Sequence, residues 1–173
     1  MINKLFCLGI SKTGTKSFVV ASKELGFNAC HNGGRPLDPD LLNEYNSFAD
    51  SNTCWFGFKE LDEKFPNSKF VLTLRDKDAW VTRILEWYNP KYKISYIKWH
   101  KYGNYYPERV DTLGELEYFY EQYQNDIYKY FEDKKYKFMA HNVFNGDGYE
   151  KLCNFLEMKI PNKEYPRLKN EKI

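Results

Sequence analysis

Short runs of apolar residues recur along the chain and predict the strands of a buried sheet. Residues 69–74, with the sequence KFVLTL, show the clearest of these patterns. The other runs are shorter, and each is followed by a loop with polar residues or glycine. The predicted strands are residues 4–8, 27–30, 69–74 and 136–140.

Between these runs, apolar residues recur at helical spacing, most regularly over residues 112–131. The helix that starts at Thr15 is closed by Gly26, and Pro66 stops another helix. Asp38 followed by Pro39 is typical of a helix cap with a proline in the first turn. The predicted helices are residues 15–25, 41–46, 55–65, 76–88, 112–131 and 148–156.

Strands that alternate with helices imply right-handed crossovers and a mostly parallel sheet that is covered on both faces. The predicted fold class is therefore α/β. No repeat, low-complexity segment or linker divides the chain, so we expect a single domain over residues 1–173. That length is sufficient to bury a core.

Composition limits the classes of function. The chain has 26 basic and 24 acidic residues and a net charge of +2, so any anion site must come from a local arrangement of residues. Its four cysteines lack metal-binding spacing, which favours reduced thiols. No apolar run approaches the roughly 18 residues of a membrane span, and no signal peptide is recognisable. We therefore expect a soluble, cytoplasmic protein that does not bind membranes.

The segment GISKTGTKS, residues 9–17, lies where the first predicted strand gives way to a helix. Gly9 and Gly14 allow tight turns, and the amides from Lys12 to Ser17 can converge on an anion with help from the helix dipole. The segment is therefore predicted to bind phosphate. The alternative is an ordinary strand–turn–helix joint with solvated lysines.

The nucleotide-binding pattern GxxxxGK[ST] fits this loop poorly. The sequence reads GxxxxGTKS, so the lysine after the second glycine is displaced by one residue, and Lys12 lies inside the loop instead. Kinases need that lysine on the β- and γ-phosphates and the following hydroxyl on magnesium. The mismatch argues against ATP.

The loop resembles the 5′-phosphosulfate loop of the sulfotransferases, which have Lys or Arg, Ser or Thr, Gly and Thr in succession. Lys16 departs from that pattern. The resemblance implies a P-loop-like, three-layer fold with a short, mostly parallel sheet flanked by helices, and 3′-phosphoadenosine 5′-phosphosulfate (PAPS) as the sulfuryl donor. The residues that we expect to bind PAPS in this loop are Ser11, Lys12, Thr13, Gly14, Thr15, Lys16 and Ser17.

PAPS also needs a site for its 3′-phosphate. The segment FPNSKFVLTLRDKDAW resembles the family's "FP.AKFILTLRDPEAW", which implies that Arg75 binds this phosphate and that Asp76 caps the next helix. The family's serine, eight residues after the arginine, is replaced by Arg83. Either Arg83 or Thr82 could take its place, and solvated side chains or a salt bridge from Arg75 to a nearby aspartate are the alternatives.

A third segment, GDGYEKLCNFLEMKIPNKEYP, resembles the family's C-terminal "G.GWE.LC.FLG..VP...FP". We interpret it as packing. Residues 84–134 have no detailed match to the family.

Sulfuryl transfer is an in-line displacement, and a positioned cation stabilises the charge that develops on the bridging oxygen. Lys12 is our candidate, and no metal is required. The resemblance implies that the general base comes from the segment that leads up to residues 69–74, here FADSNTCWFGFKEL, which contains no histidine. Asp50 is the first candidate, His31 the second and Glu60 the third. A turn cap for Asp50 and a structural role for His31 are the alternatives.

Residues 91–108 combine aromatic and basic side chains without a clear period. They are predicted to form a loop that could close over a sugar or a flat acceptor. They could also bind single-stranded nucleic acid, which we regard as the less favoured partner, or pack on residues 112–131. The acceptor and the oligomeric state are not predicted.

The leading hypothesis is thus a PAPS-dependent sulfotransferase that acts on a hydroxyl of a small molecule or carbohydrate. One alternative is a P-loop nucleotide kinase or phosphotransferase, which would need magnesium. The other is a non-catalytic nucleotide-binding relative that lacks a base.

Overall fold

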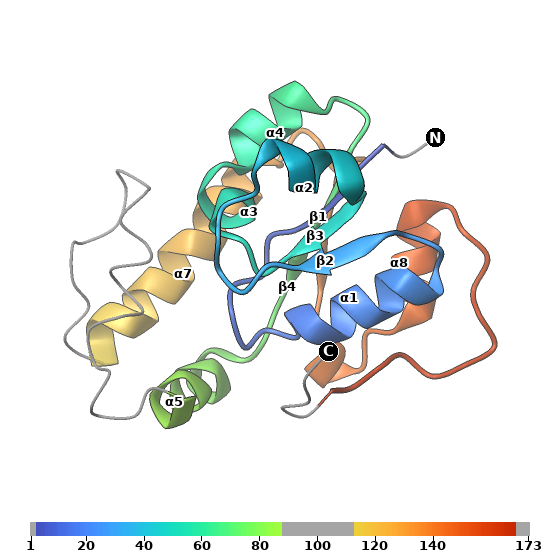
Figure 1. Cartoon of the computed structure of the whole chain (residues 1–173). Coiled ribbons are helices and arrows are strands. Elements are labelled where there is room, and N and C mark those ends of the chain that lie inside the picture. The colour runs from blue at the N-terminus through green and yellow to red at the C-terminus, as the bar shows by residue number, and fades with distance from the viewer. Residues whose placement is uncertain (1–2, 88–112, 169–173) are drawn as a thin grey trace. The chain divides into compact units, whose positions relative to one another are not determined.

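The computed structural model describes residues 3–87 and 113–168 (Figure 1). The chain forms two compact units, one from residues 1–75 and 135–173 and the other from residues 76–134. Each unit has its own packing.

A five-stranded sheet is the centre of the first unit. Its strands are β1 (Leu5–Cys7), β2 (Ala29–His31), β3 (Ser47–Ala49), β4 (Lys69–Thr73) and β5 (Phe138–His141). They lie in the order β2-β3-β1-β4-β5, and every neighbouring pair is parallel. The predicted α/β class with a parallel sheet is confirmed.

Helices cover both faces of this sheet (Figure 1). They are α1 (Thr15–Glu24), α2 (Pro39–Glu44), α3 (Asn52–Phe56), α4 (Phe58–Lys64) and α8 (Tyr149–Leu156), with a short 3₁₀ helix η2 (Val143–Asn145) after β5. On one face, α1 and α8 pack together on Leu5, Cys7 and Val71.

On the other face, aromatic rings from neighbouring strands stack in a row. Phe6 pairs in register with Phe48 of β3 and Phe70 of β4, and its ring lies 5.4 Å and 5.5 Å from theirs. Phe65, at the end of α4, adds a fourth ring 5.8 Å from Phe6. Each such pair stabilises by about 0.5–1.5 kcal/mol beyond the area it buries. This row holds the central strands in register.

The second unit contains α5 (Lys77–Trp87) and α7 (Leu113–Tyr130). Trp80 of α5 is fully buried and stacks on Tyr120 of α7, with ring centroids 4.5 Å apart. Asp76 accepts a hydrogen bond from the amide of Ala79 at 2.9 Å, so the predicted cap of α5 is confirmed. Residues 91–108, predicted to form a loop over the acceptor, lie outside the described residues.

The predicted single helix over residues 55–65 is wrong. The structure has two helices, α3 and α4, with Gly57 between them. The first helix starts at Asn52, because the side chain of Ser51 caps it by accepting from the amide of Thr53 at 3.3 Å. The predicted cap at Asp38 is confirmed by its bond from the amide of Leu41 at 2.8 Å.

Strand β3 has no counterpart in the sequence prediction. Its three residues, Ser47–Ala49, are too few to show a period, although all three side chains are buried. Its position matters because it lies next to β1 and ends at Asp50. Among the helices of the described residues, none is long and apolar enough to cross a membrane.

Candidate functional site

The sheet order brings several predicted site residues together at the carboxyl ends of the strands. The connection from β1 leads to β2 on one side, whereas the connection from β4 leads to β5 on the other. Ligands of open α/β sheets bind where connections diverge in this way, at the carboxyl ends of the strands. The loop after β1, Asp50 after β3 and Arg75 after β4 all lie at such ends.

The β1–α1 loop, residues 8–14, has the backbone of an anion site. Lys12 has a φ of 73° and Gly14, the N-cap of α1, has a φ of 100°, both in the left-handed region. No side chain caps α1 there, so its first amides are not used by a cap residue. Together with the helix dipole they favour a bound anion.

Buried hydroxyl groups hold this loop on the sheet. Thr13 is 1% exposed, and its Oγ1 donates to the carbonyl of Ile10 at 2.7 Å. The same hydroxyl lies 2.9 Å from Oγ1 of Thr73, at the end of β4. The indole of Trp55 donates to the carbonyl of Gly9 at 2.9 Å. Thr13, predicted to bind the donor, therefore also anchors the loop.

The close packing at Gly9 leads to a first prediction. A Cβ added there would lie 1.7 Å from Thr73 Oγ1 and 2.6 Å from Thr13 Oγ1. Gly9→Ala is therefore expected to lower the free energy of unfolding by about 2 kcal/mol, as overpacked cores do. Urea denaturation measures this loss. Gly114→Ala is the matched control, because its Cβ would meet nothing within 4 Å; equal losses in the two variants would contradict the packing argument.

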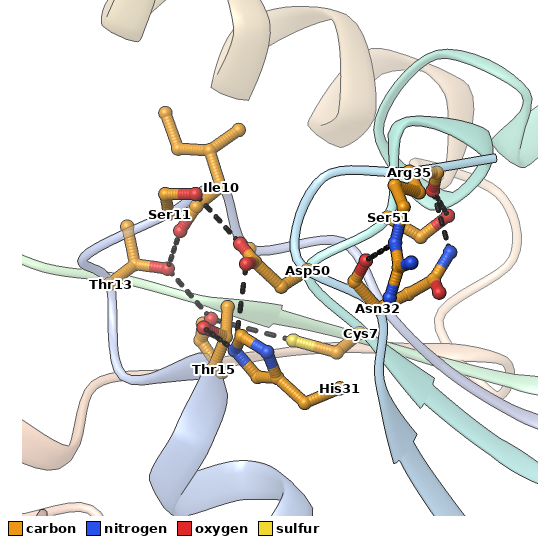
Figure 2. A network of polar contacts seen from close by, with 12 residues as sticks. Cys7, Ile10, Ser11, Thr13, Thr15, His31, Asn32, Arg35, Asp50 and Ser51 are labelled. Atoms are coloured by element: carbon orange, nitrogen blue, oxygen red, sulfur yellow. Dashed lines mark hydrogen bonds and ion pairs between the residues drawn. The ribbon is translucent and has the colours of Figure 1, made fainter. Parts of the chain in front are cut away.

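Asp50 and His31, the two rival candidates for the base, lie side by side. Figure 2 shows the Asp50 carboxylate pointing toward both Ser11 and His31. Its Oδ1 accepts from Ser11 Oγ at 2.8 Å, and its Oδ2 lies 3.5 Å from His31 Nε2. The same Nε2 is 3.2 Å from Oγ1 of Thr15, the first residue of α1. Both candidates therefore contact the phosphate-loop segment of residues 9–17.

The turn after β2 fixes the backbone of Asp50 through a hydrogen bond. Asp50 has a φ of 55°, and its carbonyl accepts from the amide of Gly34 at 2.5 Å. Figure 2 shows Asn32, Arg35 and Ser51 grouped beside it, with Ser51 Oγ donating to the Arg35 carbonyl at 2.7 Å. The oxygens of the Asp50 side chain contact Ser11 and His31, and the cap of the following helix is Ser51.

Burial is the largest effect on His31 and lowers its pKa below the usual value. The nearby Asp50 carboxylate raises the pKa in part, and the cations of Lys16 and Lys12 add smaller lowering effects. The imidazole is therefore neutral near pH 7. His141, buried at the end of β5, also has a pKa lowered by burial. Its Nε2 lies 3.3 Å from the carbonyl of Gly148.

These two histidines predict a loss of stability in mild acid. Because their pKa values are lowered in the folded state, the unfolded chain binds protons first as the pH falls below about 6.5. The free energy of unfolding is therefore expected to fall as the pH drops from about 7 to about 5.5, because each histidine is protonated more readily in the unfolded chain. Urea denaturation at both pH values measures the drop. His31→Asn and His141→Asn should each make the loss of unfolding free energy between the two pH values smaller. A loss that is unchanged in both variants would show that these histidines do not cause it.

Arg75, which was predicted to bind the 3′-phosphate, contacts the β1–α1 loop. Its Nη1 donates to the carbonyl of Lys12 at 3.4 Å, and its guanidinium carbon lies 4.5 Å from the centre of the Phe144 ring. Ser17, also predicted to bind the donor, is 4% exposed, and its Oγ accepts from the amide of Leu168 at 3.1 Å. The chain beyond α8 therefore returns to the start of α1.

The two remaining candidates, Arg83 and Glu60, lie on helices α5 and α4. Arg83 belongs to the second unit, where it pairs with Glu86 at 2.6 Å on the same helix, and Thr82 is exposed. Glu60 is exposed on the first turn of α4. Its side chain has no recorded bond to Asp50 or His31 among the contacts of the described residues.

The cysteines Cys7 and Cys54 are both buried. Burial raises the pKa of the Cys7 thiol to about 11, and the pKa of Cys54 is raised by burial as well. Both are free thiols. Within residues 3–87 and 113–168, no three side chains of His, Cys, Asp or Glu gather closely enough to hold a metal ion.

Sequence reasoning missed three residues that shape the site: Thr73, Trp55 and Phe144. Thr73 is the last residue of the clearest strand, so its place beside the loop could have been suspected from the strand end. Trp55 and Phe144 carry no comparable signal, because their partners are distant along the chain.

Comparisons with known proteins give a family and a curated relative. A family model described as "Sulfotransferase domain" matches residues 37–172. A relative from Aspergillus versicolor, "Ava biosynthesis cluster protein M", is 26% identical over an alignment of 215 residues. That alignment covers 95% of this chain and 80% of the relative.

Proposed function

The chain belongs to the sulfotransferase domain family, and on this premise we propose that it transfers a sulfuryl group from PAPS to a hydroxyl of a small molecule or carbohydrate. The observation that carries the proposal is the Asp50–His31 pair, which contacts Ser11 of the β1–α1 loop and Thr15, the first residue of α1. It combines a carboxylate that can take a proton with a loop that can hold an anion.

The residues present fit PAPS at both of its charged ends. The uncapped first turn of α1 and the lysines at positions 12 and 16 suit the 5′-phosphosulfate. Arg75, whose guanidinium has five N–H donors, can bind the 3′-phosphate while one of them holds the carbonyl of Lys12. Bound PAPS supplies a sulfuryl group on an oxygen bridge to phosphate.

The chain's own groups then have separate tasks. Asp50 accepts the proton of the acceptor hydroxyl, and neutral His31 fixes the orientation of its carboxylate. The ammonium of Lys12 stabilises the negative charge that develops on the bridging oxygen. The loop amides orient the donor for in-line attack.

The name of the A. versicolor relative refers to a biosynthesis cluster. This favours a small-molecule hydroxyl compound as the acceptor of the present chain, with nucleic acid as the less favoured partner.

Calorimetric titration with 3′-phosphoadenosine 5′-phosphate, the desulfated product, tests the proposal without an acceptor. We expect it to bind at least about tenfold more tightly than AMP, because AMP lacks the 3′-phosphate that Arg75 receives. Tighter binding of ATP with magnesium would support the kinase alternative instead. Binding without turnover for any hydroxyl acceptor would support the non-catalytic alternative.

A further inference from the structure

The turn after β5 is built to hold its shape. The side-chain oxygen of Asn142 accepts from the amides of Phe144 at 3.1 Å and Asn145 at 3.3 Å. The amide of Asn142 in turn donates to Oδ2 of Asp147 at 2.7 Å. These bonds fix the backbone of η2 and therefore the position of the Phe144 Cα atom, from which the ring projects.

Phe144 is 48% exposed, yet its ring has a defined partner. The Arg75 guanidinium carbon lies 4.5 Å from the ring centre, within the range of a cation–π contact. The same turn closes on the β1–α1 loop, since a Cβ added at Gly14 would lie 3.1 Å from Val143 Cγ1 and 3.8 Å from Phe144 Cε2.

Arg75 connects the Phe144 ring to Lys12, the loop residue whose backbone conformation is energetically least favourable. Lys12 has a φ of 73°, a conformation that residues with side chains rarely adopt. Its carbonyl accepts from Arg75 Nη1 at 3.4 Å. The guanidinium is thus placed between the Phe144 ring and the Lys12 backbone.

We propose that Phe144 is a positioning residue for sulfuryl transfer: its ring orients Arg75, and Arg75 keeps Lys12 in the conformation that directs its ammonium to the donor. The proposal rests on the proposed function. It gives Arg75 a second role beside the 3′-phosphate, and it assigns a role to an exposed aromatic residue that carries no donor or charge of its own.

A planar, delocalised guanidinium can stack on an aromatic face and donate in its own plane at the same time. Both contacts are made here by one side chain. Loss of the ring should leave the guanidinium more rotamers and Lys12 a less populated active conformation. Since the ring acts on the loop, the effect should extend to every anion that the loop binds.

Inorganic pyrophosphate is the probe that separates this role from direct contact with the nucleotide, because it has neither a base nor a 3′-phosphate. Calorimetry should compare pyrophosphate and 3′-phosphoadenosine 5′-phosphate on the wild-type protein, Phe144→Leu and Phe144→Tyr. Phe144→Leu should weaken pyrophosphate binding roughly threefold to fivefold. It should weaken nucleotide binding at least as much, because Arg75 also receives the 3′-phosphate. Phe144→Tyr, which keeps the aromatic face, should restore wild-type affinity.

Two controls sharpen the test. Tyr136→Leu removes an aromatic side chain that is 70% exposed, just before the amino end of β5, and should change neither affinity. In an Arg75→Ala protein, Phe144→Leu should have no further effect on pyrophosphate affinity, because the ring acts through the guanidinium.

Three results would overturn the positioning role. They are weakened nucleotide binding with unchanged pyrophosphate binding, equal affinities in Phe144→Leu and the wild type, and an undiminished effect of Phe144→Leu without Arg75. A wild-type protein that binds neither anion would contradict the proposed function itself, and the positioning role with it.

Discussion

Asp50→Asn is expected to lower kcat for sulfuryl transfer by about a thousandfold, with little change in the affinity for 3′-phosphoadenosine 5′-phosphate. General base catalysis contributes about 10²- to 10⁴-fold, and asparagine cannot accept the proton. The amide has nearly the same shape and can still accept from Ser11 Oγ, which lies 2.8 Å from Oδ1. The loss should therefore fall on kcat rather than on donor binding, as single-turnover kinetics with saturating PAPS would measure.

His31→Gln separates the two members of the pair. In the proposed mechanism His31, 3.5 Å from Asp50, orients the carboxylate and does not itself take the proton, so its loss should lower kcat by only about tenfold. Asp40→Asn, an exposed change on the first turn of α2, is the control. A larger loss for His31→Gln than for Asp50→Asn would assign the base to the histidine.

Lys12→Met should lower kcat by about 10²- to 10³-fold, the range expected when one electrostatic stabiliser of the transition state is removed. Methionine keeps the length and bulk of the side chain, and the backbone strain at the φ of 73° is the same for both residues. The free energy of unfolding should therefore change by less than about 0.5 kcal/mol. Steady-state kinetics together with urea denaturation would show whether the loss is chemical.

Lys23→Met, an exposed change at the other end of α1, is the control for the general loss of a positive charge. Lys12→Arg should recover part of the rate, since it restores the charge with a different shape. Comparable rates for Lys12→Met and Lys23→Met would rule out a catalytic role for Lys12.

The general architecture could be predicted from the sequence because it depends on local patterns. Alternating apolar runs and helical periods predicted the α/β class, which the sheet order confirms. The prediction failed where a pattern was too short or was interrupted. Strand β3 has three residues, and the helix predicted over residues 55–65 is divided at Gly57. Both errors fall next to Asp50, so the sequence alone did not show which elements hold this residue.

The candidate site was predicted residue by residue, but its connections were not. Asp50 and His31 were treated as competitors, because nothing in the sequence shows that β2 and β3 are neighbours. The bond from Trp55 to the Gly9 carbonyl and that between Thr13 and Thr73 join residues 46 and 60 positions apart. Such contacts follow from strand order, which local patterns do not determine.

The measurement that tests the central claim most directly follows the sulfuryl group itself. PAPS with radiolabelled sulfur is incubated with the protein and a panel of phenols, aliphatic alcohols and sugars, and the products are separated. The account predicts that label appears on a hydroxyl compound with the wild-type protein and not with Asp50→Asn. Label that never leaves PAPS for any hydroxyl, while phosphate is transferred from ATP with magnesium, would contradict it.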